Sequence, residues 1–160
     1  MRKINVLQKV NVVSIQLVKE KSLAYGSIQI STPKDAAAIA ESFLAGADRE
    51  HAVVMCLDTK QNINAINTIS VGTLNSSPIH PREVFKPAIL ANSNAIIIFH
   101  NHTSGIPTPS ADDLGITKRL VVAGSILGVE VLDHLIIGDN GSYVSLKETG
   151  VIKQLNESSD

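Results

Sequence analysis

The sequence predicts a single α/β domain in which a mixed β-sheet is flanked by helices. Three observations favour this fold class: short aliphatic runs separated by helix-start and turn signals, an apolar content of 44%, and only three Phe, two Tyr and no Trp. A core with so few aromatic rings must be built from Ile, Val, Leu and Ala, and the β-branched members of that set favour strands. A chain of 160 residues can bury such a core as one unit.

Local signals place the elements along the chain. Thr32 and Pro33 have the chemistry of a helix N-cap and first helical residue, and Ser110 precedes a second helix in the same way. The expected elements are, in order, a strand within 4–18, a helix over 33–45, strands at 51–57 and 63–71, a helix over 80–90, a strand from 95, a helix over 110–123 ending at 124 or soon after, strands at 129–137 and 143–146, and a frayed tail from 154.

Charge and cysteine content exclude several classes of protein. The net charge is −1 and Lys and Arg form no long run, so nothing in the sequence indicates nucleic-acid binding. The only cysteine, Cys56, rules out an intrachain disulfide framework and lies in an apolar run, where buried packing is its expected role. No signal peptide or apolar span of membrane length is present, so a cytoplasmic protein without a membrane segment is expected.

A His-x-His pair directly after the apolar run 95–98 points to a metal site. Residues two apart on a strand face the same side, so His100 and His102 can present two imidazoles to one ion while Asn101 faces the other way. After a loop rich in Pro and Gly, a helix start carries Asp112 and Asp113 back toward the imidazoles. Two His and one carboxylate leave a coordination position open, which is typical of a catalytic zinc site.

The serine of the same stretch has two interpretations. Ser110 and Asp113 stand at the spacing of a capping box, which by itself explains both residues as helix-start chemistry. One helical residue rotates a side chain by about 100°, so Asp112 and Asp113 cannot both face one ion.

The complete pattern, His-x-His, seven residues and Ser-x-x-Asp, resembles that of the JAMM/MPN metalloprotease superfamily. The stretches HNHTSGIPTPSADD, GTLNSSPIHPREVF, VLDHLIIG and SYVSLKETG together resemble the RadC-like JAB domain over roughly 31–150. The resemblance implies a JAB/MPN fold related to cytidine deaminases, in a domain at 31–150 between an N-terminal strand extension at 1–30 and a tail at 151–160. The pattern departs from the family at Thr103, where proline is usual.

The resemblance also implies a mechanism and assigns residues to it. It implies one zinc ion per chain on His100, His102 and Asp113, Ser110 as the donor to an oxyanion, and hydrolysis of a peptide or isopeptide bond by metal-activated water. Glu50, just before a predicted strand, matches the position of the general base.

The sequence leaves the roles of three further residues open. Glu83 is the alternative candidate for the general base. It could instead be a first-turn residue favoured by the helix dipole, or a hydrogen-bond partner of a metal ligand. His134 is a second candidate for such a partner, and His80 has no assigned role.

The alternatives to a hydrolase are a non-catalytic metal-binding interaction module in a DNA-repair or mobile-element system, and a metal-dependent nuclease. Longer family members carry an N-terminal helix-hairpin-helix region, and with roughly thirty residues before this domain we expect that region to be missing here. The DNA-repair name of the family is therefore expected to give only weak support for a nucleic-acid role. The expected partner is a peptide or protein substrate, whose identity the sequence does not indicate. The oligomeric state is open.

Overall fold

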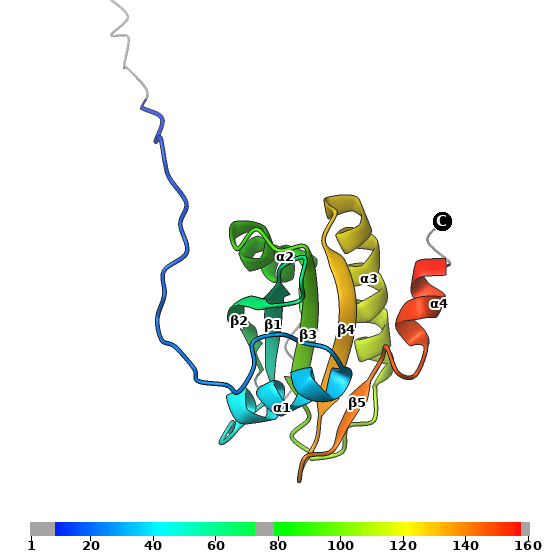
Figure 1. The fold of residues 1–160 in the computed structure, drawn as a ribbon. Coiled ribbons are helices and arrows are strands. Elements are labelled where there is room, and N and C mark those ends of the chain that lie inside the picture. The colour runs from blue at the N-terminus through cyan, green and yellow to red at the C-terminus, as the bar shows by residue number, and fades with distance from the viewer. Residues whose placement is uncertain (1–8, 73–78, 158–160) are drawn as a thin grey trace, which may run out of the picture.

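The central strand of the fold is apolar from residue 95 to residue 99 because helices cover both faces of the sheet around it. The computed structural model describes residues 9–72 and 79–157, and these form a five-stranded sheet in the order β2-β1-β3-β4-β5 (Figure 1). The strands are β1 (His51–Leu57), β2 (Ile63–Val71), β3 (Ala95–Asn101), β4 (Glu130–Ile137) and β5 (Tyr143–Ser145). β3 and β4 are parallel and the other neighbours antiparallel, so the sheet is mixed as predicted.

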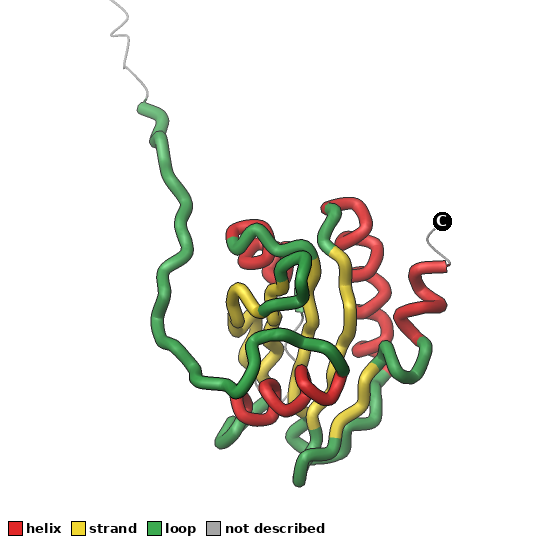
Figure 2. The backbone as a smooth tube through the Cα atoms, in the orientation of Figure 1, coloured by secondary structure: helices red, strands yellow, loops and turns green. Residues whose placement is uncertain are grey.

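The helices divide between the two faces of the sheet (Figures 1 and 2). Helix α1 packs on one face, and α2, α3 and α4 pack on the other. The helices are α1 (Pro33–Leu44), α2 (Pro81–Leu90), α3 (Ala111–Leu127) and α4 (Val151–Glu157). Alternation along β3 supplies both cores: Ile97 and Phe99 point to α1, whereas Ile96 and Ile98 point to α2 and α3. Residue 100, next in the second series, therefore faces α3.

Helix α3 runs past Gly124, the nearer of the end points that the sequence predicts. It continues through Gly124 and ends at Leu127, where Gly128 caps it in the left-handed conformation with φ 69°. A glycine inside a helix costs backbone entropy, but Gly124 is buried against Phe85 and the carbonyl of Val129, in a space that a Cβ atom would overfill. Close packing, not a helix end, accounts for this glycine.

The prediction of an N-terminal strand within 4–18 is wrong for the residues that are described. Residues 9–18 have extended backbone but pair with no strand in the described parts of the chain, and the N-terminal extension makes only one isolated bridge, Gln29 with Asn62. Alternation of apolar residues produces a strand only when a partner supplies the ladder hydrogen bonds. Residues 4–8 lie outside the described residues, as do residues 73–78 of the GTLNSSPIHPREVF stretch.

The frayed tail predicted from 154 is also corrected. Residues 151–157 form α4, because Ile152 is buried and Leu155 packs against the core between the sheet and α3. Tertiary packing of this kind stabilises a short amphipathic helix, and local sequence signals do not predict such packing. Within the described ranges, every helix is too short or too polar to traverse a bilayer.

Candidate metal centre

The ends of two elements form the site. His100 belongs to β3 and His102 follows one residue after its end, both on the α3 side of the sheet, while the loop 103–109 leads into α3. Ser110 caps α3 in a capping box: its Oγ accepts the Asp113 backbone N–H at 3.1 Å, and its own backbone N–H donates to the Asp113 carboxylate at 2.7 Å. The box holds the Asp113 carboxylate in the first turn of α3, facing the strand end.

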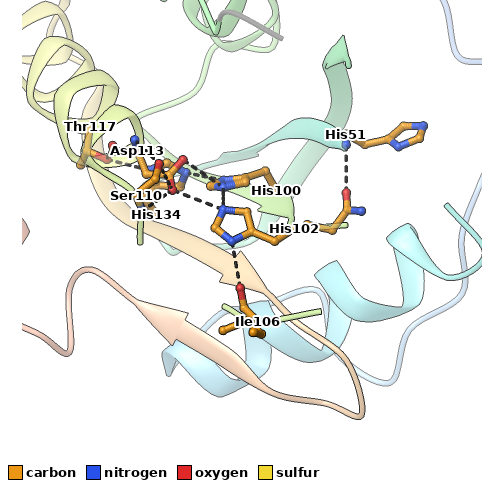
Figure 3. A network of polar contacts seen from close by, with 9 residues as sticks. His51, His100, His102, Ile106, Ser110, Asp113, Thr117 and His134 are labelled. Atoms are coloured by element: carbon orange, nitrogen blue, oxygen red, sulfur yellow. Dashed lines mark hydrogen bonds and ion pairs between the residues drawn. The ribbon is translucent and has the colours of Figure 1, made fainter. Parts of the chain in front are cut away.

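Three electron-pair donors converge there (Figure 3). His100 Nε2 lies 3.1 Å from Asp113 Oδ1, His102 Nε2 lies 3.3 Å from Asp113 Oδ2, and the two Nε2 atoms are 3.0 Å apart. All three side chains are at most 16% exposed. Asp112 is exposed, so only one of the two neighbouring aspartates joins the group.

The tautomer of His102 follows from its other ring nitrogen. Nδ1 lies 2.9 Å from the carbonyl oxygen of Ile106, which can only accept, so Nδ1 carries the hydrogen. Nε2 of the neutral ring then has a free lone pair directed at His100 and Asp113. The loop after β3 thus orients this imidazole through its own backbone.

A longer chain of hydrogen bonds sets the tautomer of His100. The Thr117 hydroxyl has one proton, which it donates to the Asp113 carbonyl oxygen at 2.6 Å, so it must accept from His134 Nδ1 at 2.7 Å. His134 Nε2 is then an acceptor and receives a hydrogen bond from His100 Nδ1 at 2.9 Å. Consequently His100 Nε2 also has a free lone pair facing the centre.

The environment of His134 supports this assignment. The ring is fully buried, and burial lowers its pKa to about 3, so the imidazole is neutral near pH 7. The structure therefore places His134 directly behind His100, on its far ring nitrogen.

The donor set fits a zinc ion. Tetrahedral coordination with bonds of about 2.0–2.1 Å separates ligand atoms by about 3.3–3.4 Å, close to the 3.0–3.3 Å seen among these atoms. Two imidazole lone pairs and a carboxylate at these distances form a donor set that one metal ion could bridge.

Asp113 is held as the anion. Burial raises the pKa of this carboxyl, whereas the hydrogen bonds that it accepts from the hydroxyl and the backbone N–H of Ser110 lower it. Ser110 Oγ also donates to Asp113 Oδ2 at 2.7 Å. A deprotonated carboxylate is the form that binds a metal.

The donors open into a cleft of about 840 Å³. Its lining includes Glu50, Ser110, Asp112, Arg119 and the three donor residues. The antiparallel register pairs Ala52 of β1 with His100, so Glu50, two residues earlier, lies on the same face and level with His102. The structure thus brings Glu50 to the cleft from the strand beside the one that carries the histidines.

Asn101 clamps the backbone on both sides of Glu50. Its Oδ1 accepts the N–H of His51 at 2.9 Å, and its Nδ2 donates to the carbonyl of Arg49 at 3.0 Å. The residue between the two histidines therefore couples the entry of β1, with Glu50, to the strand end that holds the imidazoles.

The other candidates lie elsewhere. Glu83 is absent from the lining of the cleft; its carboxylate binds Lys86 at 2.8 Å and approaches Arg82 at 3.7 Å on the same helix. His80 caps α2, with Nδ1 accepting the Arg82 N–H at 3.2 Å. The sequence predicts no role for Thr117 or for the side chain of Asn101. Their hydrogen bonds join residue 117 to residue 134 and residue 101 to residue 49, and no local motif indicates either contact.

Comparisons with known proteins assign the family. The family model for the RadC-like JAB domain matches residues 30–151. A UPF0758 protein of Desulfitobacterium hafniense is 55% identical over 123 residues, which cover 77% of this chain and 54% of that protein. UPF0758 proteins of Shouchella clausii and Rubrobacter xylanophilus are 49% and 45% identical, over 76% and 87% of this chain and 52% and 61% of their own lengths.

The chain thus spans about half of the length of the curated relatives it matches. The matched region contains every residue of the candidate centre. With a matching family model over most of the chain and relatives at about half identity, this chain belongs to the RadC-like JAB domain family.

Proposed function

We propose that this domain is a zinc-dependent hydrolase of peptide or isopeptide bonds. The observation that carries the proposal is the convergence of His100 Nε2, His102 Nε2 and the Asp113 carboxylate at the edge of a large cleft. Three protein ligands, rather than four, are the composition of catalytic zinc sites. A bound zinc ion supplies a Lewis acid and lowers the pKa of water to about 7.

Glu50 is the proposed general base. It takes the proton of the attacking water and passes it to the leaving amine, a role that contributes about 10²- to 10⁴-fold to rate. The proposal is supported by its place in the lining of the cleft and on the same sheet face as the histidines. Asn101 limits the freedom of the backbone at both neighbours of Glu50 and so positions its carboxylate.

Ser110 is the proposed donor to the oxyanion. Its hydroxyl lies in the cleft lining beside the donor set, with its proton directed at Asp113 Oδ2. Rotation about one bond redirects this proton to a carbonyl oxygen that becomes negative during attack. One such donor is worth on the order of 3 kcal/mol to the transition state.

The cleft favours an amide substrate over a phosphodiester. Its fully charged lining residues are three carboxylates, Glu50, Asp112 and Asp113, and one cation, Arg119, which does not suit a polyanion. Nucleases more often bind two metals through several carboxylates, whereas the described residues contain one such group of three. We propose a peptide or protein as the substrate and the cytoplasm as the location, in keeping with the one free, buried thiol.

The test pairs two carboxylate variants. Protein purified without chelator and loaded with zinc is expected to hold about one zinc per chain by elemental analysis. It is then incubated with a peptide library and with isopeptide-linked peptides, and the product masses are recorded. Glu50→Gln should keep its zinc and lose at least about 100-fold in rate, because the amide cannot accept the proton.

Glu83→Gln is the matched control and should retain activity, because that carboxylate is paired on α2 outside the cleft. Absence of zinc after loading would refute the metal centre. Unchanged hydrolysis by Glu50→Gln would remove Glu50 from the mechanism. Full zinc occupancy without cleavage of any amide would instead favour the non-catalytic binding module.

A further inference from the structure

The segment Val10 to Val18, here called the arm, lies apart from the rest of the molecule. In Figures 1 and 2 the chain before α1 first passes close to the sheet and α1, and its more N-terminal part then runs away from them as an extended path. The arm has the sequence VNVVSIQLV, nine residues without a charge, a proline or a glycine. Its apolar side chains face solvent, with Val12 99% and Ile15 75% exposed. Such a segment has the composition of a strand but no partner strand among the described residues.

An open edge of similar length exists on the same molecule. β2, with the sequence INAINTISV, is a nine-residue edge strand that also has no charge or proline. Within the described ranges its only ladder is with β1, so its outer backbone groups face away from the sheet over most of the strand. Edge strands usually carry lysine or proline as protection against pairing, and β2 has neither, although its ladder with β1 is irregular at two points.

The arm does not reach the β2 edge of its own chain. Among the described residues, the N-terminal extension pairs with that edge only around the bridge between Gln29 and Asn62, where Ile63 N–H donates to the Ile28 carbonyl at 2.8 Å. Tyr25 packs against the core on the α1 face, and the Lys21 ammonium lies 5.6 Å from the centre of the Phe43 ring on α1. These contacts hold the chain at α1, and residues 9–18 before them pair with no strand in the described parts of the chain.

We infer that the arm adds as a strand to the β2 edge of a second copy, whose own arm adds to β2 of the first. Because each molecule carries both an arm and an edge, one two-fold axis satisfies both pairs and the assembly closes as a dimer. Strand addition of this kind takes its affinity from main-chain hydrogen bonds and its register from alternating side chains. Neither the arm nor β2 contains any of the three donor residues, so the proposed contact uses none of the metal ligands.

Sedimentation velocity of the whole chain over a range of concentrations tests the inference. The expected result is a monomer–dimer equilibrium. Ile15→Lys in the arm and Thr68→Lys on β2 each place a charge in the new ladder, and each should raise the dissociation constant by at least about 100-fold. Both residues are exposed in the protomer, so neither variant should lose its far-UV dichroism or its unfolding midpoint.

Ile126→Lys is the matched control, because Ile126 is an 81% exposed isoleucine on α3 and should leave the dimer intact. Mixing the two disrupted variants should restore some dimer, since one intact arm then meets one intact edge. A wild-type monomer at all concentrations would overturn the inference, as would a dimer unchanged in Ile15→Lys or no dimer in the mixture. Zinc content and Glu50→Gln have no bearing on these results.

Discussion

One hydroxyl proton, on Thr117, decides where the hydrogens of two histidines lie. Because that proton is used on the Asp113 carbonyl, His134 must donate from Nδ1 and accept at Nε2, and His100 must donate from Nδ1. The same carbonyl belongs to the residue whose carboxylate completes the donor set. Thr117 therefore links the backbone of Asp113 to the ring orientation of His100. It does not contact the metal position and would affect metal binding only through these two residues.

Thr117→Val should weaken zinc binding by about 10- to 100-fold, because it keeps the shape of the side chain but removes both hydrogen bonds. It should also lower the free energy of unfolding by about 1–3 kcal/mol, since His134 Nδ1 and the Asp113 carbonyl lose a buried partner. Competition with a fluorescent zinc chelator measures the first effect, and urea unfolding measures the second.

The control for this prediction is Thr149→Val, which removes a hydroxyl that donates to the Leu146 carbonyl at 3.2 Å, away from the centre. It should leave zinc affinity unchanged. Thr117→Ser keeps the hydroxyl and should restore most of the affinity. If Thr117→Val bound zinc as tightly as the wild type, the hydrogen-bond chain would have no part in preparing His100.

The sequence predicts the metal-donor residues better than it predicts the residues that hydrogen-bond to them. His100, His102, Ser110 and Asp113 lie in one short stretch, where strand alternation and helix-start chemistry already bring them together. Thr117 meets His134 only because α3 packs on β4. That contact depends on the tertiary fold, and no periodicity in the sequence encodes it.

At the scale of elements, the two ends of α3 have different roles: one positions a donor residue, and the other packs against the core. Its first turn holds Asp113 in the capping box, and its last turns pack on α2 and on the entry to β4. The fit at the second end is close at Gly124, where an added Cβ would lie 2.4 Å from the Val129 carbonyl oxygen and 3.2 Å from Phe85 Cζ. The position of the first turn therefore depends on a glycine three turns away.

Gly124→Ala should destabilise the domain by about 1–3 kcal/mol, because the added methyl meets backbone that cannot move aside cheaply. Gly115→Ala, in the same helix, should stabilise it by about 0.5–1 kcal/mol, since no atom lies within 4 Å of the added Cβ and alanine loses less backbone entropy. Urea unfolding of the two variants measures both. Equal stability of Gly124→Ala and wild type would contradict the close packing of α3.

The same helix shows why some element boundaries escaped prediction. A glycine predicts a helix end at 124 because it costs about 1 kcal/mol relative to alanine, but burial against Phe85 and Val131 outweighs that cost. The arm shows the opposite case, where local alternation is present and a partner strand is not. Elements with strong caps and a buried partner, such as α1 and β1, were predicted within one residue of their observed bounds.

At the scale of the whole molecule, the metal centre lies outside the two cores that hold the fold together. The donors sit at a strand end and a helix start, while aliphatic side chains fill both faces of the sheet without them. A core of this extent supports a domain of this length by itself. Metal binding should therefore add stability by mass action without being a condition for folding.

Removal of zinc with a chelator should lower the midpoint of thermal unfolding but leave the transition cooperative and the near-UV dichroism intact. Cys56 provides an independent probe, because it is the only cysteine, it is fully buried in the core between the sheet and α2, and burial raises its pKa to about 11. Its thiol can react with an aromatic disulfide reagent at pH 8 only when that core opens. The reaction should stay slow in the folded protein with and without chelator, and become fast in urea. Labelling of the chelated protein at the rate seen in urea would mean that the metal holds the core together, and the centre would then be structural.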